Sequence, residues 1–241
     1  MLTRFLLLLI TIFSLQSLAT PLRIAVASNF KLPLNEIVTQ YQKSTNKKVT
    51  VSSASSGILY QQIKAGAPFD VFLSADENRP TMLVNENFAI AQSMYVYAQG
   101  QLVFYSPKQK IKLSQLNNSD NKLVIANPLH APYGVAAKKV LNDILTTPFK
   151  GTYITSSNIA SAFQIVHSGN APAGLVSMSH IVSTEVKQKD YILLNNENAY
   201  IPQAVVILTR SKKLTESNDF ITYLKSEEAK NIIKHYGYQV K

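Results

Sequence analysis

The sequence predicts an α/β fold of two lobes, each a mostly parallel sheet flanked by helices and joined to the other by a hinge of two extended crossings. Three observations support this prediction. Short apolar strands alternate with amphipathic helices from residue 23 onwards, the alternation starts again near residue 122, and two long extended stretches lie outside both series. Strands that alternate with helices indicate parallel pairing through helical crossovers.

The first series predicts three strands and two helices. Short apolar runs suited to buried strands occupy 23–27, 48–52 and 70–74. After the first strand, apolar residues follow the i, i+3, i+4, i+7 spacing of an amphipathic helix at Leu34, Ile37, Val38 and Tyr41. A second helix is predicted after Ser55-Ser56-Gly57, with its apolar side chains between Ile58 and Ile63.

The second series has the same order of elements. Strands are predicted at 122–126, 153–155 and 174–178. The proline-containing turn 127–132 leads into a helix that starts at Tyr133 or Gly134 and ends near Leu145. Ser157-Asn158 is expected to cap another helix that runs to about His167.

Two extended stretches predict the hinge, at 95–105 and 201–208. Lobes joined by paired extended crossings close around a ligand by hinge motion. We therefore expect a first lobe from 20–98 and 204–241, to which the last helices return, and a second lobe from 99–203.

The first nineteen residues predict export. Arg4 precedes an apolar run from Phe5 to Phe13, and Ser17-Leu18-Ala19 places small residues before a cleavage site near Ala19. This is the pattern of a secretory signal peptide. The apolar run is shorter than the roughly 20 residues that span a bilayer. We expect a protein that is exported to the periplasm without its residues 1–19.

Composition excludes several classes of function. The chain has no cysteine, so cysteine-based zinc sites and thiol catalysis are excluded. The net charge of +10 is spread over scattered lysines rather than a basic run interleaved with aromatic residues, so no nucleic-acid surface is predicted. The four histidines have no metal-binding spacing; they are His130, His167, His180 and His235.

The loops after the predicted strands share one kind of chemistry. They supply hydroxyls, amides and backbone N–H groups but no charged side chain, and they are Ser28-Asn29, Ser55-Ser56-Gly57, Tyr133-Gly134 and Asn158-Ile159. Helix N-termini at the carboxyl ends of parallel strands form a ready anion site. A site made only of donors disfavours a protonated anion, whose own O–H would find no acceptor. A fully ionised tetrahedral oxyanion is the expected ligand, although each loop taken singly could be no more than a helix cap.

Several stretches resemble the periplasmic molybdate-binding proteins of ABC transporters. They are 25–30 (AVASNF), 53–57 (SASSG), 65–76 (AGAPFDVFLSAD), 126–134 (ANPLHAPYG), 158–163 (NIASAF) and 236–238 (YGY). The resemblance covers nearly the whole chain after residue 19. It implies the type II periplasmic binding protein fold and a role in capturing molybdate, or tungstate, for an ABC permease and its ATPase.

The resemblance also implies a set of ligand-binding residues. Ser28 and Ser56 would donate from hydroxyl and backbone, Asn29 would donate in the subgroup that has asparagine there, and Tyr133 and Ile159 would donate backbone N–H groups. The metal of the oxyanion would be held only through these residues, with no direct metal ligand and no further cofactor.

Three more residues are secondary candidates, namely Ser55, Ser177 and Gln203. Many members of the family place a tyrosine that donates to the anion where this chain has Ser177, and a serine is too short to reach as far. Gln203 lies on a hinge crossing, where a structural role is the simpler interpretation.

Other functions remain open at this point. The site could hold another oxyanion such as sulfate or chromate, or the chain could be a sensing module for a signalling partner. A hydrolase that uses a cleft serine is a further alternative, but the G-x-S-x-G nucleophile elbow is missing. We expect a monomeric transport protein that is not an enzyme.

Overall fold

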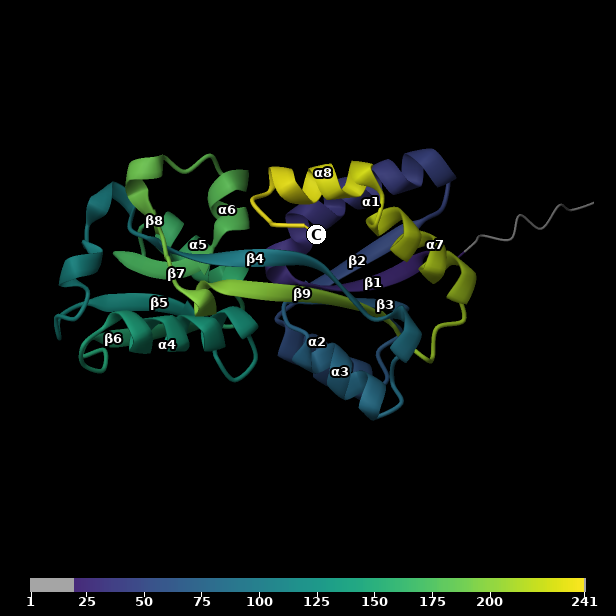
Figure 1. Cartoon of the computed structure of the whole chain (residues 1–241), viewed down its shortest axis with the longest axis horizontal. Helices are drawn as coiled ribbons and strands as arrows, with labels where there is room; N and C mark the ends of the chain where they lie inside the picture. Colours follow the sequence, from purple (N-terminus) through teal and green to yellow (C-terminus); the bar gives the residue numbers. More distant parts are fainter. Residues whose placement is uncertain (1–19, 241) are drawn as a thin grey trace, which may run out of the picture.

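A computed structural model describes residues 20–240 as two lobes that share one sheet (Figure 1). The predicted signal peptide at 1–19 lies outside the described residues. Among the described residues, no helix has the length and apolar character needed to cross a membrane.

The first lobe contains strands β1 (Leu22–Ala27), β2 (Val49–Ala54) and β3 (Val71–Ser74). They pair in parallel in the order β2-β1-β3, so their carboxyl ends lie at one edge. One face is covered by α1 (Lys31–Thr45), α7 (Leu214–Leu224) and α8 (Glu227–His235). The other face is covered by α2 (Ser56–Lys64) and α3 (Asn78–Asn85).

The second lobe repeats this arrangement with a core of its own. Its parallel strands are β5 (Lys122–Ala126), β6 (Thr152–Ser156) and β7 (Ala173–Ser177), in the order β7-β5-β6. Its helices are α4 (Pro132–Ile144), α5 (Ile159–His167) and the short α6 (Met178–Ser183).

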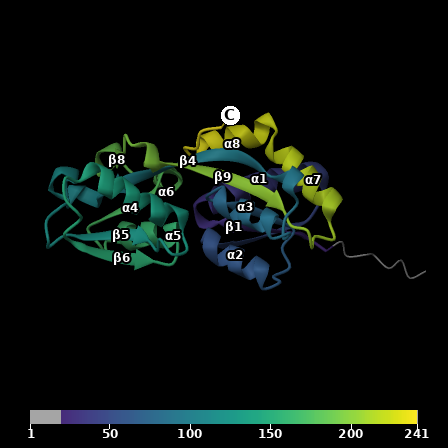
Figure 2. The ribbon, with the colours of Figure 1, turned by 60° about the horizontal axis from the view of Figure 1, so that its bottom comes forward.

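Two long strands connect the lobes, β4 (Tyr95–Tyr105) and β9 (Tyr200–Ile207). They pair antiparallel and run together from one half of the molecule to the other (Figures 1 and 2). β9 continues against β3 in the first lobe, while the end of β4 pairs with β7 and with β8 (Tyr191–Leu193) in the second. The predicted two-lobed α/β architecture and its paired crossings are therefore confirmed. The exact lobe boundaries stay a prediction.

Several local boundaries differ from the expectation by one or two residues, and two of these differences lie next to the lobes' facing loops. Met178 begins α6 instead of ending a strand, because Ser177 is the extended N-cap residue of that helix. α4 begins at Pro132, one residue before the predicted start. Proline suits the first helical position, where its missing N–H would have no partner and its fixed φ is already helical. The helices α3 and α6 and the strand β8 have no counterpart in the sequence prediction.

Candidate functional site

A small cavity lies between the lobes, at the carboxyl ends of strands from both of them. Ten residues line it: Ala27, Ser28, Asn29, Ser55, Ser56, Ala75, Ala131, Pro132, Tyr133 and Ile159. All five residues predicted as primary ligand contacts are among them, together with the secondary candidate Ser55. The structure thus brings together residues that lie up to 131 positions apart in the chain, from Ser28 to Ile159.

Most of the cavity wall comes from the starts of four helices, and Ala75 follows β3. β1 leads into a 3-10 turn at Ser28–Phe30 and then α1, and β2 leads into α2. In the second lobe, β5 leads through a turn into α4, and β6 leads into α5. Because backbone N–H groups in the first turn of a helix lack intrahelical partners and the dipole is positive there, four such ends favour an anion.

Ser55 occupies the N-cap position of α2, but its side chain makes no capping hydrogen bond. The hydroxyl is buried and finds no hydrogen-bond partner among the described residues. A buried polar group without a partner costs free energy, and such groups are rare in native proteins. The free hydroxyl at the cavity wall is therefore a donor available to a ligand.

Ser56, the next residue, uses its hydroxyl differently. Its Oγ accepts a hydrogen bond of 2.9 Å from the backbone N–H of Ala75, the residue after β3. A hydroxyl that accepts one bond still has its own hydrogen to donate. Ser56 thus ties the start of α2 to the end of β3 while leaving a hydrogen for the cavity.

Asn29 is the centre of a buried network at the hinge. Its side-chain nitrogen donates to Oε1 of Gln203 at 2.8 Å and to the hydroxyl of Tyr238 at 2.9 Å. The carbonyl of Asn29 accepts from Tyr238 and from Ser179, both at 2.8 Å. Because the amide has only two N–H hydrogens and both are engaged, a ligand contact from Asn29 in this conformation would come from its backbone N–H.

Tyr133 lines the cavity, and its side chain runs towards the hinge strand β4. A Cβ added to Gly100 on β4 would be 2.2 Å from the Tyr133 hydroxyl, so this glycine makes room for the ring. Burial holds the pKa of Tyr133 well above its usual value, so the phenol stays neutral. The expected contact between the Tyr133 backbone N–H and the ligand stays a prediction.

Ser177 and Gln203 lie outside the cavity wall. The Ser177 hydroxyl is hydrogen-bonded to Nδ1 of His180 and lies 3.2 Å from Oγ of Ser179. Burial lowers the pKa of His180 to about 4, so its ring is neutral at physiological pH and stacks against Phe163. Gln203 holds Asn29 and donates to the carbonyl of Ile201. Neither side chain lines the cavity: Gln203 accepts a hydrogen bond from the lining residue Asn29, and Ser177 lies against Ser179, which donates to Asn29.

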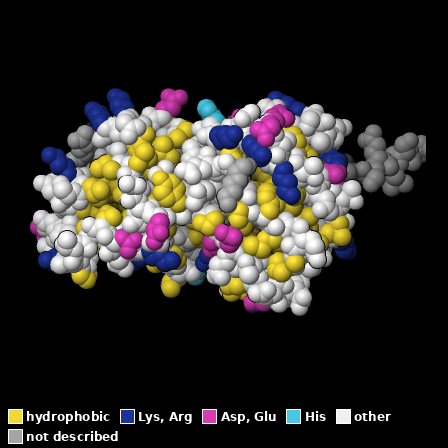
Figure 3. Space-filling view, in the orientation of Figure 1, with side chains coloured by type: hydrophobic (Ala, Val, Ile, Leu, Met, Phe, Trp, Pro, Cys, Tyr) yellow, Lys and Arg dark blue, Asp and Glu magenta, His cyan; other side chains and the backbone are white. Residues whose placement is uncertain are grey.

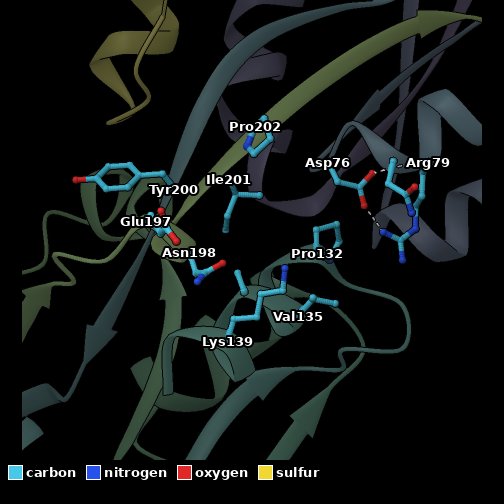
Figure 4. A pocket seen from close by; sticks show the side chains of 12 residues that line it. Asp76, Arg79, Pro132, Val135, Lys139, Glu197, Asn198, Tyr200, Ile201 and Pro202 are labelled. Atoms are coloured by element: carbon cyan, nitrogen blue, oxygen red, sulfur yellow. Dashed lines mark hydrogen bonds and ion pairs between the residues drawn. The ribbon is translucent and has the colours of Figure 1, made fainter. Parts of the chain in front are cut away.

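Charged side chains stay outside this cavity. None of its ten lining residues carries a charge, and the described part of the chain holds no cluster of His, Asp or Glu suited to a metal ion. A larger pocket of about 430 Å³ lies beside it, with Asp76 and Arg79 on one side and Lys139 on the other (Figure 4). Arg79 is paired with Asp76 there.

Sequence reasoning missed Ser179 and Tyr238 as parts of the site. Both bond to Asn29 from elements that lie about 150 and 209 positions away in the chain. The YGY stretch drew attention to Tyr238, but nothing in the sequence indicated its partner.

Comparisons with known proteins give a consistent result. Residues 22–239 match the family described as bacterial extracellular solute-binding protein. The chain is 37% identical to the molybdate-binding protein ModA of Azotobacter vinelandii over 91% of this chain and 90% of that one. It is 34% identical to ModA of Rhodobacter capsulatus over 89% of this chain and 86% of that one. The solved periplasmic molybdate-binding protein of Azotobacter vinelandii superposes with a TM-score of 0.82 at 32% identity, covering 91% and 99%.

Proposed function

The chain belongs to the bacterial extracellular solute-binding protein family, and on that premise we propose that it captures molybdate, or tungstate, in the interlobe cavity and presents it to an ABC permease and its ATPase. The relatives that are 37% and 34% identical carry the name molybdate-binding protein, which supports this ligand. The proposed site residues are Ser28, Asn29, Ser55, Ser56, Tyr133 and Ile159.

The observation that carries the proposal is the composition of the cavity wall. Four helix starts converge on it, no lining residue is charged, and the buried Ser55 hydroxyl has no protein partner within residues 20–240. Neutral donors stabilise a dianion through hydrogen bonds and helix dipoles, without a buried counter-charge. No carboxylate among the described residues lines the wall to accept the proton of a protonated anion, so a fully ionised oxyanion is favoured.

Capture requires the lobes to separate. The cavity volume is about 10 Å³, close to the least that holds one water molecule. A four-oxygen anion is larger than one water, and the walls come from both lobes. The ligand therefore enters with the hinge open, and the cavity is wider around the bound anion than in this structure when closure brings the second set of helix starts onto it.

The test is a melting-temperature panel with molybdate, tungstate, chromate, sulfate and phosphate. Ligand at about 100 times its Kd adds about 2.7 kcal/mol to the free energy of unfolding, so we expect a rise in Tm of about 5–10 °C for a protein of this size. The chain has no tryptophan, so calorimetry or an extrinsic dye is the suitable readout.

Other outcomes would point elsewhere. A rise with sulfate or phosphate but not with molybdate would contradict the ligand and favour another oxyanion. No rise with any oxyanion would contradict the transport role as a whole. Hydrolysis by Ser28 or Ser56 has little support, because no His, Asp or Glu lines the cavity to act as the base.

A further inference from the structure

Gly57 lies in the first turn of α2, where nothing in the local backbone calls for glycine. The helix runs from Ser56 to Lys64, and Gly57 is not among the glycines with positive φ. Alanine is a better helix former than glycine, so local energetics alone would favour a side chain at this position.

The reason for the glycine lies in the opposite lobe. The backbone N–H of Gly57 donates to the carbonyl of His130, in the turn before α4, at 2.8 Å. A Cβ added to Gly57 would be 2.7 Å from that carbonyl oxygen and 2.9 Å from the His130 Cα. Real Cβ atoms essentially never approach backbone atoms so closely, so a side chain here would hold the two lobes apart.

The turn that carries His130 has little freedom to retreat. Its backbone is held by Asn127, whose carbonyl accepts from the N–H of His130 at 3.1 Å and from Ala131 at 2.8 Å. The Asn127 side chain also accepts from the N–H of Leu129 at 3.0 Å. On the other side, Nη2 of Arg79 would be 3.0 Å from the added Cβ.

A second bond spans the lobes at the hinge side of the cavity. Oγ of Ser179, on α6 of the second lobe, donates to the carbonyl of Asn29 in the first lobe at 2.8 Å. Gly57 and Asn29 each adjoin a serine of the cavity wall, Ser56 and Ser28. The contacts between lobes therefore flank the ligand residues directly.

We propose that Gly57 is a positioning residue for ligand capture. Because glycine has no Cβ, the first turn of α2 can come close enough to hydrogen-bond to the His130 carbonyl. This contact between Gly57 and His130, called the clasp below, holds the lobes closed over the oxyanion. The inference rests on the proposed function. The first turn of α2 then serves two purposes at once, because Ser56 faces the ligand while Gly57 bonds to the opposite lobe.

The test compares Gly57→Ala with Gln62→Ala, an exposed position on the same helix. Titration calorimetry with molybdate gives the Kd, and small-angle X-ray scattering with and without molybdate gives the change in radius of gyration. Thermal unfolding without ligand gives the effect of the substitution on the stability of the ligand-free protein. We expect Gly57→Ala to weaken binding by about tenfold to one-hundredfold, the range that overpacking of a tight contact produces. Its compaction on binding should be smaller than in the wild type, while its ligand-free Tm is unchanged or higher because alanine favours the helix.

Ser179→Ala supplies a second variant, since it removes another bond between the lobes without adding bulk. It should weaken molybdate binding while the variant still compacts. Wild-type affinity and full compaction in Gly57→Ala would overturn the clasp, and so would a large fall in its ligand-free Tm, which would show a purely structural role. If the wild type itself binds no oxyanion, the proposed function fails first and the clasp fails with it.

Discussion

Ser55 and Ser56 are neighbours at the start of α2 and line the same cavity, but their hydroxyls differ in hydrogen bonding. The Ser56 hydroxyl accepts from the backbone N–H of Ala75, whereas the Ser55 hydroxyl is buried with no partner in the described part of the chain. A serine that is buried for stability makes a hydrogen bond inside the protein, as Ser56 does. A buried serine hydroxyl without such a bond, as in Ser55, is better explained by contact with a ligand. Substitutions at these two positions should therefore distinguish an effect on stability from an effect on binding.

We expect Ser55→Ala to leave the ligand-free protein as stable as the wild type, because the change removes an unsatisfied group. Binding of molybdate should weaken by about tenfold or more, as for loss of a hydrogen bond to a charged group. Ser56→Ala should weaken binding and also destabilise the ligand-free protein by about 1–3 kcal/mol, since the Ala75 N–H loses its acceptor. Denaturant unfolding without ligand and titration calorimetry measure the two effects; equal stability loss in both variants would contradict this distinction.

Helix starts are the elements that build the site, and their caps differ. Asn158, the N-cap residue of α5, accepts from the backbone N–H of Ser161 at 3.0 Å and so fixes the turn that places Ile159 at the cavity. Ser226 caps α8 in the same way, accepting from Ala229, but α8 does not line the cavity. The two caps are a matched pair, one at the site and one remote from it.

Asn158→Ala and Ser226→Ala should each lower the free energy of unfolding by about 0.5–2 kcal/mol through loss of a cap. Only Asn158→Ala should also weaken molybdate binding, because the N–H of Ile159 then points less consistently into the cavity. Chemical denaturation and calorimetry on both variants provide the comparison. Equal affinity in the two would indicate that the start of α5 does not contact the ligand.

The whole molecule carries a formal charge of +10, yet its excess lysines are not in the site. On the face in Figure 3, Lys and Arg side chains are dispersed over both lobes rather than gathered in one patch. A positive field of this kind attracts an anion from a distance and is screened by salt. Neutral donors in a closed cavity are screened much less.

Ionic strength should therefore act on the rate of association and leave the rate of dissociation nearly constant. Between about 0.01 M and about 1 M ionic strength the Debye length falls from about 30 Å to about 3 Å, which removes the long-range attraction. Stopped-flow measurements with an extrinsic dye give both rates. A dissociation rate that rises steeply with salt would instead reveal a charged group in contact with the ligand.

Much of the fold could be predicted from the sequence, because its signals are local. The period of apolar residues in 31–45 and the short apolar strands depend on neighbours a few positions away, and so did the candidate serines after β1 and β2. α3 and α6 were missed because they are short, with eight and six residues. Met178 was assigned to a strand because its apolar character fits either element.

What the sequence determined by itself was the series of elements and the neutral, donor-rich character of the loops between them. Only the tertiary structure decided which donors are free. It engaged the Asn29 amide with Gln203 and Tyr238, and it left the Ser55 hydroxyl without a partner in the described residues. It also explains why residue 57 is glycine, because the His130 carbonyl, 73 positions away in the chain, leaves no room for a Cβ there. The physical reason is that hydrogen bonds and steric contacts depend on distance in space, which the order of residues along the chain does not specify.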